Sequence, residues 1–124
     1  MKMHSSIAIA IAAGMLAPAI SAHAADAQRG KSLYETRCTT CHSLEYHGAG
    51  PAHKGVFGRK AGSAPGYAYS QALKDSTVVW NAQTIDKWLS GPDAFIPGQK
   101  MWFSIPDAVD RADIIAYLAA ATKR

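Results

Sequence analysis

Residues 37–45 read RCTTCHSLE and contain both cysteines of the 124-residue chain. Two threonines separate Cys38 from Cys41, and His42 follows the second cysteine directly. If this segment is helical, the two thiols lie about one turn apart on one face, and the imidazole four residues after Cys38 points to the same side. The pattern C-x-x-C-H is the attachment signal for a c-type haem. We therefore predict one covalent haem c, with thioether bonds to Cys38 and Cys41 and with His42 on its iron.

Three other roles for the cysteine pair remain as alternatives. A disulfide between such close positions would constrain little of the unfolded chain. A thioredoxin-like redox pair belongs beside a βαβ pattern, and the sequence contains no convincing parallel strands. Zinc could recruit His47 or His53 as a fourth ligand, but the adjacent Cys41 and His42 fit poorly on one tetrahedron.

The N-terminal residues have the composition of an export signal. A basic start precedes an apolar run over residues 7–20, and a small-x-small triplet ends at Ala24. This order is typical of a secretory signal peptide. As a helix the apolar run would span about 21 Å, against a hydrocarbon core of about 30 Å, which argues against a permanent membrane anchor. We expect residues 1–24 to be removed by cleavage after Ala24, leaving one domain at residues 25–124.

The exported chain is small and modestly basic. About 100 residues suffice for a single domain with a thin core. Without Lys2 the chain has 12 Lys+Arg against 9 Asp+Glu, a formal charge of +3. No basic run is longer than two residues, whereas nucleic-acid-binding surfaces cluster their charge. The charge pattern argues against a nucleic-acid partner and fits a mild preference for acidic proteins.

Met101 is the only methionine left once the signal peptide is removed. A haem iron bound by one histidine has a second axial position, and its occupant separates electron carriers from gas binders and peroxidase-like enzymes. Met101 follows Pro97 and Gly98 in a loop that could lay the thioether against a flat cofactor. A single methionine is also a common core filler, and His47 and His53 are competing ligands.

The rest of the sequence predicts helices joined by long loops. Asp26 is a candidate cap for a first helix that runs through Tyr34 to the cysteine pair. The glycine-rich stretch 51–66 has no sustained hydrophobic periodicity and is expected to be a long irregular loop. Such a loop fits a small compact domain only if it wraps a buried cofactor. Further helices are expected over Ser70–Lys74, over Ala82–Ser90 between an Asn81 cap and Gly91-Pro92, and from near Asp107 or Asp110 to about Thr122.

Six segments resemble the class I c-type cytochromes, in the branch similar to mitochondrial cytochrome c. They follow the family order and cover nearly all of residues 25–122: CTTCH, GPAHKGVFGRKAG, GYAYSQAL, the W of VVW, IPGQKMWF and RADIIAYL. The resemblance implies an all-α cytochrome c fold, with three main helices, a short helix and long loops wrapped around one covalent haem. It also implies His42 and Met101 as axial iron ligands, and a crossing of the first and last helices near Gly30 with Tyr34 and Tyr117 beside it.

The same resemblance assigns roles around the haem. Pro51 would supply the carbonyl that accepts the second ring N–H of His42. Arg59, Tyr69 and Trp80 match family residues that pair with or solvate the haem propionates.

Several positions depart from the family pattern. Where relatives commonly have Asn, Tyr and Thr around a buried water, this chain has Leu73, Trp88 and Gln99. Trp88 is expected in the haem pocket but offers only a donor N–H, so we expect a drier pocket or a rearranged water. A drier pocket would raise the reduction potential and altered donation to the sulfur would oppose that change, so these residues alone do not fix the sign of the shift. His53 stands where leucine is usual, and we expect it to be partly exposed and to titrate near neutral pH.

The resemblance implies a bacterial periplasmic electron carrier rather than an enzyme. Single electrons would pass through the exposed haem edge, from a membrane cytochrome complex or a dehydrogenase to an oxidase or another periplasmic redox protein, in respiration or photosynthesis. We expect a monomer. Two alternatives stay open: a dedicated cytochrome subunit of a periplasmic oxidoreductase, and a haem enzyme or ligand sensor with a labile sixth ligand. The candidate docking residues are Phe103, at the haem pocket, and Lys31, Lys54, Lys87 and Lys100.

Overall fold

The computed structural model describes residues 14–18 and 24–122. Most of the predicted signal peptide, residues 1–13 and 19–23, lies outside the described residues. In the described part no helix is long and apolar enough to cross a membrane. The regular elements there are helices, joined by loops and one isolated bridge between Lys60 and Val79: α1 Ala27–Arg37, α2 Gln71–Asp75, α3 Ala82–Ser90, α4 Pro92–Phe95 and α5 Ala108–Ala121. The predicted all-α class, with three main helices, is confirmed.

Each of the three longer helices begins at a residue with a capping side chain. The Asp26 carboxylate accepts two backbone N–H groups from the first turn of α1, both at 3.0 Å. Asn81 and Thr84 form a reciprocal capping box at the start of α3. Of the two acids considered for the last helix, Asp107 is the cap of α5, since its side chain accepts the N–H of Asp110 at 2.9 Å. Local hydrogen bonds of this kind satisfy backbone donors that the helix itself leaves unpaired.

The short helix α4 was not predicted from the sequence. Gly91 and Pro92 end α3 as expected, but Pro92 is also the first residue of α4. Proline is favoured at that position because its missing N–H would be unpaired anyway. The N–H of Ile96 donates to the Pro92 carbonyl at 2.9 Å and closes this single turn.

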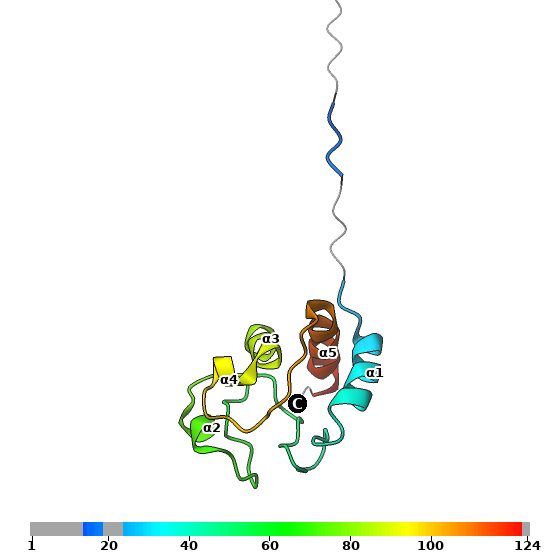
Figure 1. The fold of residues 1–124 in the computed structure, drawn as a ribbon. Coiled ribbons are helices and arrows are strands. Elements are labelled where there is room, and N and C mark those ends of the chain that lie inside the picture. Colours follow the sequence, from blue (N-terminus) through cyan, green and yellow to red (C-terminus); the bar gives the residue numbers. More distant parts are fainter. Residues whose placement is uncertain (1–13, 19–23, 123–124) are drawn as a thin grey trace, which may run out of the picture.

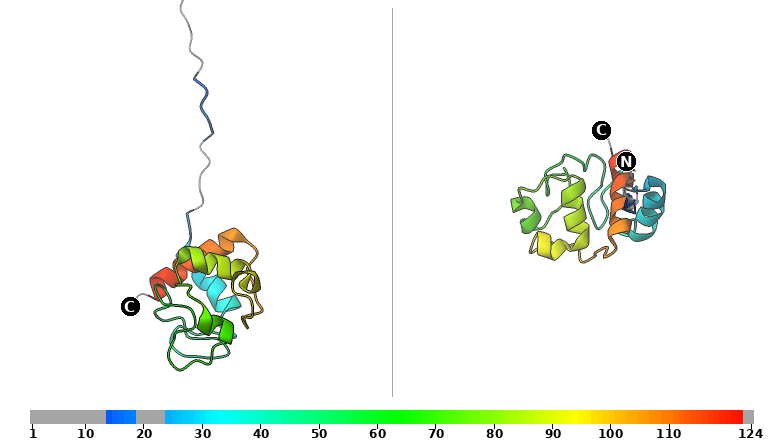
Figure 2. Two further views of the ribbon diagram at one scale, coloured as in Figure 1. Left: turned by 90° about the vertical axis from the view of Figure 1, so that its left-hand side faces the viewer. Right: turned by 90° about the horizontal axis from the view of Figure 1, so that it is seen from above.

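α1 and α5 lie side by side across one end of the molecule (Figures 1 and 2). A Cβ at Gly30 of α1 would overlap the backbone carbonyl of Asp113 in α5, so glycine is what permits this close approach. The rings of Tyr34 and Tyr117 flank the crossing, with their centroids 5.3 Å apart. The predicted crossing at Gly30 is therefore confirmed.

A network of ionic hydrogen bonds joins the same two helices. Asp113 has no solvent exposure, and it accepts the N–H of Asp26 at 2.8 Å and Arg29 Nη1 at 2.6 Å. The other terminal nitrogen of Arg29 pairs with Asp110, which also pairs with Arg37 at 3.1 Å. Buried carboxylates are tolerated when they are paired in this way.

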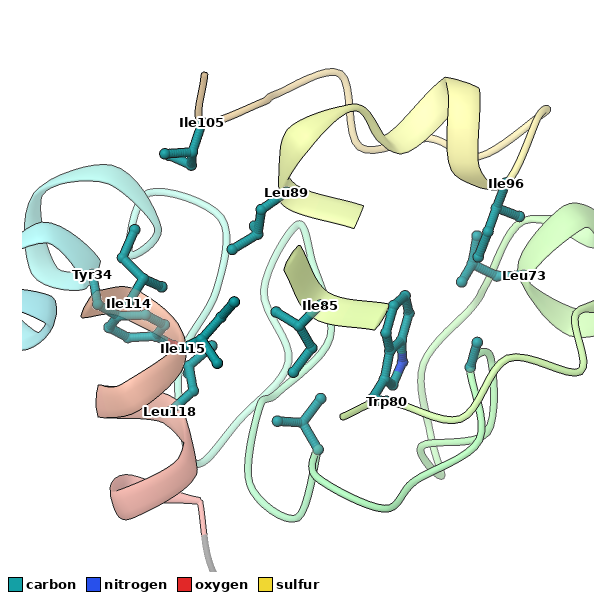
Figure 3. Close-up of a cluster of buried hydrophobic side chains, with 12 residues drawn as sticks. Tyr34, Leu73, Trp80, Ile85, Leu89, Ile96, Ile105, Ile114, Ile115 and Leu118 are labelled. Carbon is teal, nitrogen blue, oxygen red and sulfur yellow. The ribbon is translucent and has the colours of Figure 1, made fainter. Parts of the chain in front are cut away.

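The hydrophobic core extends from α5 through α3 to the loops around α2 (Figure 3). Ile85 and Leu89 of α3 point toward the apolar face of α5, while Trp80 lies on the side of Leu73 and Ile96. The long loops therefore pack against a core of aliphatic and aromatic side chains that lies between α5, α3 and α2.

Candidate cofactor-binding site

The two cysteines lie where α1 ends. Cys38 is the C-cap residue, and its N–H donates to the Tyr34 carbonyl at 2.9 Å. One further turn follows, because the N–H groups of Cys41 and His42 donate to the Cys38 carbonyl at 3.2 and 2.9 Å. Both thiols are free, with Cys38 partly buried and Cys41 exposed. The C-x-x-C-H motif therefore forms one hydrogen-bonded turn that directly continues α1.

The His42 ring is held at one edge. Its Nδ1–H donates to the Pro51 carbonyl at 2.8 Å. A Cβ at Gly50 would overlap the ring, so glycine is required beside it. Burial lowers the pKa of His42, against the effect of the Pro51 carbonyl, and a neutral ring with Nδ1 protonated carries its lone pair on Nε2. Metal-binding histidines have this arrangement, in which the second ring nitrogen donates to a carbonyl.

The structure disfavours the thiol-redox and zinc alternatives. Burial raises the pKa of the Cys38 thiol to about 11, whereas redox-active cysteines have a lowered pKa. Among residues 14–18 and 24–122 no group of three or more His, Cys, Asp or Glu side chains could hold a metal ion. Both ring nitrogens of His47 are engaged, since Nδ1 accepts the Ala52 N–H at 2.9 Å and Nε2 donates to the Pro65 carbonyl at 2.8 Å. His47 therefore ties two loops together.

Met101 lies in the loop after α4, partly buried against the core. Gly98 has a φ of +88°, a conformation that residues with a side chain rarely adopt. The Gln99 side-chain oxygen accepts the Met101 N–H at 2.5 Å. A cavity of about 260 Å³ beside this loop is lined in part by Gln99, Met101 and Phe103.

Arg59, Tyr69 and Trp80, which are predicted to lie at the haem propionates, all come from loop segments between the helices. Arg59 donates to the carbonyls of Lys54 at 2.9 Å and Ala52 at 3.1 Å. The Tyr69 hydroxyl accepts a backbone N–H at 3.2 Å, and Trp80 is buried in the core. A backbone hydrogen bond of 2.9 Å from Trp80 to the Arg59 carbonyl brings these two residues together. The propionate contacts themselves stay a prediction.

The three positions that depart from the family pattern are largely enclosed. Leu73 is buried in α2 and Gln99 is 2% exposed. The Trp88 ring packs edge-on against Trp80, with centroids 5.4 Å apart. Within the described residues the side-chain nitrogen of Gln99 is buried and has no hydrogen-bond partner. A buried amide donor of this kind requires an acceptor, and a carboxylate or an ordered water at the cofactor would supply one.

His53 is partly exposed, as expected, but its surroundings differ from the expectation. Its Nδ1 shares a hydrogen bond of 2.8 Å with the Tyr34 hydroxyl, and its ring stacks on His42 with centroids 4.2 Å apart. Burial, with the charges of His42 and Arg59, lowers the pKa of His53 to about 3. The expected titration near neutral pH is therefore wrong. Since His53 lies against His42, it is poorly placed as a ligand on the opposite face of a cofactor.

Two features of the site were missed from the sequence. The first is the Tyr34–His53 pair, which joins residues 19 positions apart and leaves no periodic pattern. The second is Trp102, which is 77% exposed next to Phe103 at 44%. The sequence did contain a signal for this exposed apolar patch, because two aromatic residues follow Met101 directly in the loop that begins near Gly98.

The donor set fits a covalently attached haem. Two free thiols on one turn, a tethered imidazole with Nε2 available and an unpaired buried amide near Met101 match what such a group requires. A helical domain with this constellation belongs to the class of c-type haem proteins.

Comparisons with known proteins agree. The cytochrome c family model matches residues 27–122. Cytochrome c of Euglena viridis is 47% identical over 96 residues, covering 75% of this chain and 94% of that protein. Cytochrome c2 of Rhodomicrobium vannielii is 41% identical over 119 residues, covering 92% and 94%. The solved structure of cytochrome cH from Methylobacterium extorquens superposes with a TM-score of 0.73 at 44% identity, covering 77% of this chain and 98% of that one.

The chain belongs to the cytochrome c family. Proteins of this family carry electrons on a covalent, iron-containing haem c and are not enzymes. The predicted family, fold class and cofactor are therefore confirmed.

Proposed function

We propose that residues 25–124 form an exported, monomeric carrier of single electrons in the periplasm. The observation that supports the proposal is the His42 ring, whose Nδ1–H donates to the Pro51 carbonyl at 2.8 Å, so that Nε2 would be the nitrogen to bind the iron. This ring follows the two free thiols on the same turn. Beyond membership of the family, the proposal specifies the iron ligands, the cellular compartment and the redox partners.

In this proposal Cys38 and Cys41 hold the haem by thioether bonds, and His42 and Met101 are its two axial ligands. When bound, the haem supplies a one-electron couple between ferric and ferrous iron, and a methionine ligand favours the ferrous state. The loop from Gly98 to Met101 presents the thioether, and the Gln99 side chain holds the Met101 N–H. Two protein ligands leave no position for a substrate.

The chain's polar groups would neutralise the haem propionates. Arg59 brings a positive charge that the carbonyls of Lys54 and Ala52 hold in place, and the Gln99 amide is a buried donor that lacks an acceptor among the described residues. We place both groups near the propionates, together with Tyr69 and Trp80. Pairing of this kind offsets the cost of burying an anion.

The 1–24 segment has a partial counterpart in one relative. The alignment with cytochrome c2 of Rhodomicrobium vannielii covers 92% of this chain, which is about 114 of its 124 residues and more than the 100 residues after Ala24. It therefore continues into the N-terminal segment. Cleavage after Ala24 is testable by N-terminal sequencing of the protein from the periplasm.

A docking surface is proposed around the Met101 loop. Trp102 and Phe103 expose apolar area there, and Lys100 adds a positive charge. Lys54 and Lys31 contribute less, because they pair with Glu45 at 3.2 Å and with Glu35 at 3.9 Å. The partners would be a membrane cytochrome complex or a dehydrogenase as donor, and an oxidase or another periplasmic redox protein as acceptor.

A redox-titrated visible spectrum of the exported protein tests the proposal. We expect a low-spin spectrum of His/Met ligation, loss of the sulfur-to-iron band in Met101→Ala, and carbon monoxide binding by that variant alone. Carbon monoxide binding by the unaltered protein would instead indicate a ligand sensor with a labile sixth ligand.

The exposed Trp102 also fits a second candidate, a cytochrome subunit bound permanently to one oxidoreductase. Large exposed aromatic side chains mark interaction sites. Sedimentation of a periplasmic extract distinguishes the two, because a free carrier sediments as a monomer and a subunit sediments with its enzyme.

A further inference from the structure

The His53 ring covers one face of the His42 ring. The two ring centroids are 4.2 Å apart and the planes are inclined by 24°. The hydrogen bond from Nδ1 to Pro51 holds one nitrogen of His42, and the backbone of Gly50 lies close against the ring. A hydrogen bond at one nitrogen leaves a ring free to tilt about it, whereas a stacked neighbour opposes that tilt. The stack therefore restrains the direction of the His42 plane.

His53 is itself fixed at two points. Its backbone N–H donates to the Ser43 carbonyl at 2.9 Å, which ties its segment to the residue after His42. Its Nδ1 shares the hydrogen bond of 2.8 Å with the Tyr34 hydroxyl. This bond pairs the Nδ1 of a largely enclosed imidazole, which would otherwise be left without a protein partner there.

The position of the Tyr34 hydroxyl is set by the helix crossing. Tyr34 is 2% exposed in α1, and its ring packs against Tyr117 of α5. The Tyr34 and His53 rings are also in edge contact, with centroids 5.6 Å apart. A continuous series of contacts therefore runs from the α1–α5 interface through Tyr34 and His53 to His42.

We propose that Tyr34 and His53 are positioning residues, which orient the His42 imidazole plane above the haem. This inference rests on the proposed role of His42 as an iron ligand. Groups behind a metal ligand orient it and tune the metal, and the direction of an axial imidazole plane governs how its orbitals overlap those of a ferric iron. The pair thus sets the electronic structure of the centre without touching the iron.

The test compares the ferric haem methyl shifts, measured by NMR, and the midpoint potential across matched variants. Tyr34→Phe removes only the hydroxyl, and His53→Leu removes the stacked ring. We expect both variants to rearrange the methyl shifts and to move the potential in the same direction. The double variant should resemble His53→Leu alone, because the hydroxyl acts through His53. His53→Phe, which keeps a flat ring, should return the shifts toward those of the unaltered protein.

Tyr117→Phe is the control, because it removes a hydroxyl from the same crossing but not the one bonded to His53. Its spectrum and potential should equal those of the unaltered protein. Unchanged shifts in Tyr34→Phe, or equal changes in Tyr117→Phe, would overturn the inference. A spectrum of the unaltered protein without histidine ligation would overturn the proposed function as well. Histidine-ligated spectra that are identical in all variants would overturn the positioning role alone.

Discussion

Gly30 of α1 lies directly against the backbone carbonyl of Asp113 in α5. A Cβ at position 30 would overlap the carbonyl oxygen, and it would also lie 3.0 Å from the Tyr117 Cβ. Both obstacles belong to a helix, so neither can move without moving the interface. The two helices can therefore approach this closely only with glycine at the crossing.

Gly30→Ala should destabilise the protein in spite of the higher helix propensity of alanine. Propensity alone would stabilise α1 by about 1 kcal/mol, whereas forcing a methyl group into a packed interface costs about 1–3 kcal/mol or more. We expect a net loss of about 2 kcal/mol in the free energy of unfolding, measured by denaturant titration. Gly91→Ala is the control, because its added methyl would meet Ala94 at an ordinary 3.7 Å. Equal stability of the two variants would show that the crossing can open at no cost.

Asp113→Ala should also destabilise the helix pair, through the donors it leaves behind. The N–H of Asp26 and the Nη1 group of Arg29 each lose a hydrogen bond to a charged acceptor, although Arg29 keeps its pair with Asp110. Hydrogen bonds to charged groups contribute about 1.5–3 kcal/mol each. The exposed pair of Lys31 and Glu35, at 3.9 Å, offers a comparison. We expect Glu35→Ala to change the free energy of unfolding by less than about 0.5 kcal/mol. Thermal unfolding of both variants checks the difference.

Leu73→Asn should lower the midpoint potential. Leu73 is buried in the core cluster against which Trp88 and Met101 pack, and a polar group there would stabilise the more highly charged ferric state. One hydrogen bond of about 1 kcal/mol corresponds to roughly 40 mV for a one-electron couple. Leu73→Met, which keeps the site apolar and similar in volume, should leave the potential unchanged. A potential that ignores the asparagine would mean that the haem does not sense this position.

Trp102→Ser should slow electron transfer to a partner without altering the fold. The side chain is 77% exposed, so its removal costs little stability, while an aromatic residue at the centre of an interface can contribute about 2 kcal/mol to binding. We expect a fall of about tenfold or more in the rate at which membranes of the source organism oxidise the reduced protein. Tyr46→Ser is the matched control, since Tyr46 is 72% exposed in a separate groove beside Cys41. Equal rates in both variants would place the docking surface elsewhere.

Local signals in the sequence predicted the parts of this fold that local chemistry decides. Asp26, Asn81 and Asp107 each cap a helix because their side chains reach backbone N–H groups within three residues. The helix α4 is not evident from the sequence because Gly91-Pro92 indicates the end of α3, although proline also favours the first position of a new helix.

The contacts that join distant segments could not be predicted in the same way. His53 stacks on His42 and bonds to Tyr34 only because the loop after Pro51 folds back over the attachment turn. Its lowered pKa depends on that enclosure, which residue type alone does not reveal. The resemblance to a family predicted which residues form the site. For the positions that depart from the family, the sequence gives only the residue type and does not predict the contacts that each residue makes.

Arg29 and Asp113 meet across 84 positions of the chain, so the contact between the terminal helices closes a loop that holds most of the domain. Closing a loop of this length costs conformational entropy, and the local contacts of α1 do not offset that cost. We therefore expect α1 to be weakly helical on its own and to become stable only once α5 packs against it, so that the two ends of the domain fold together.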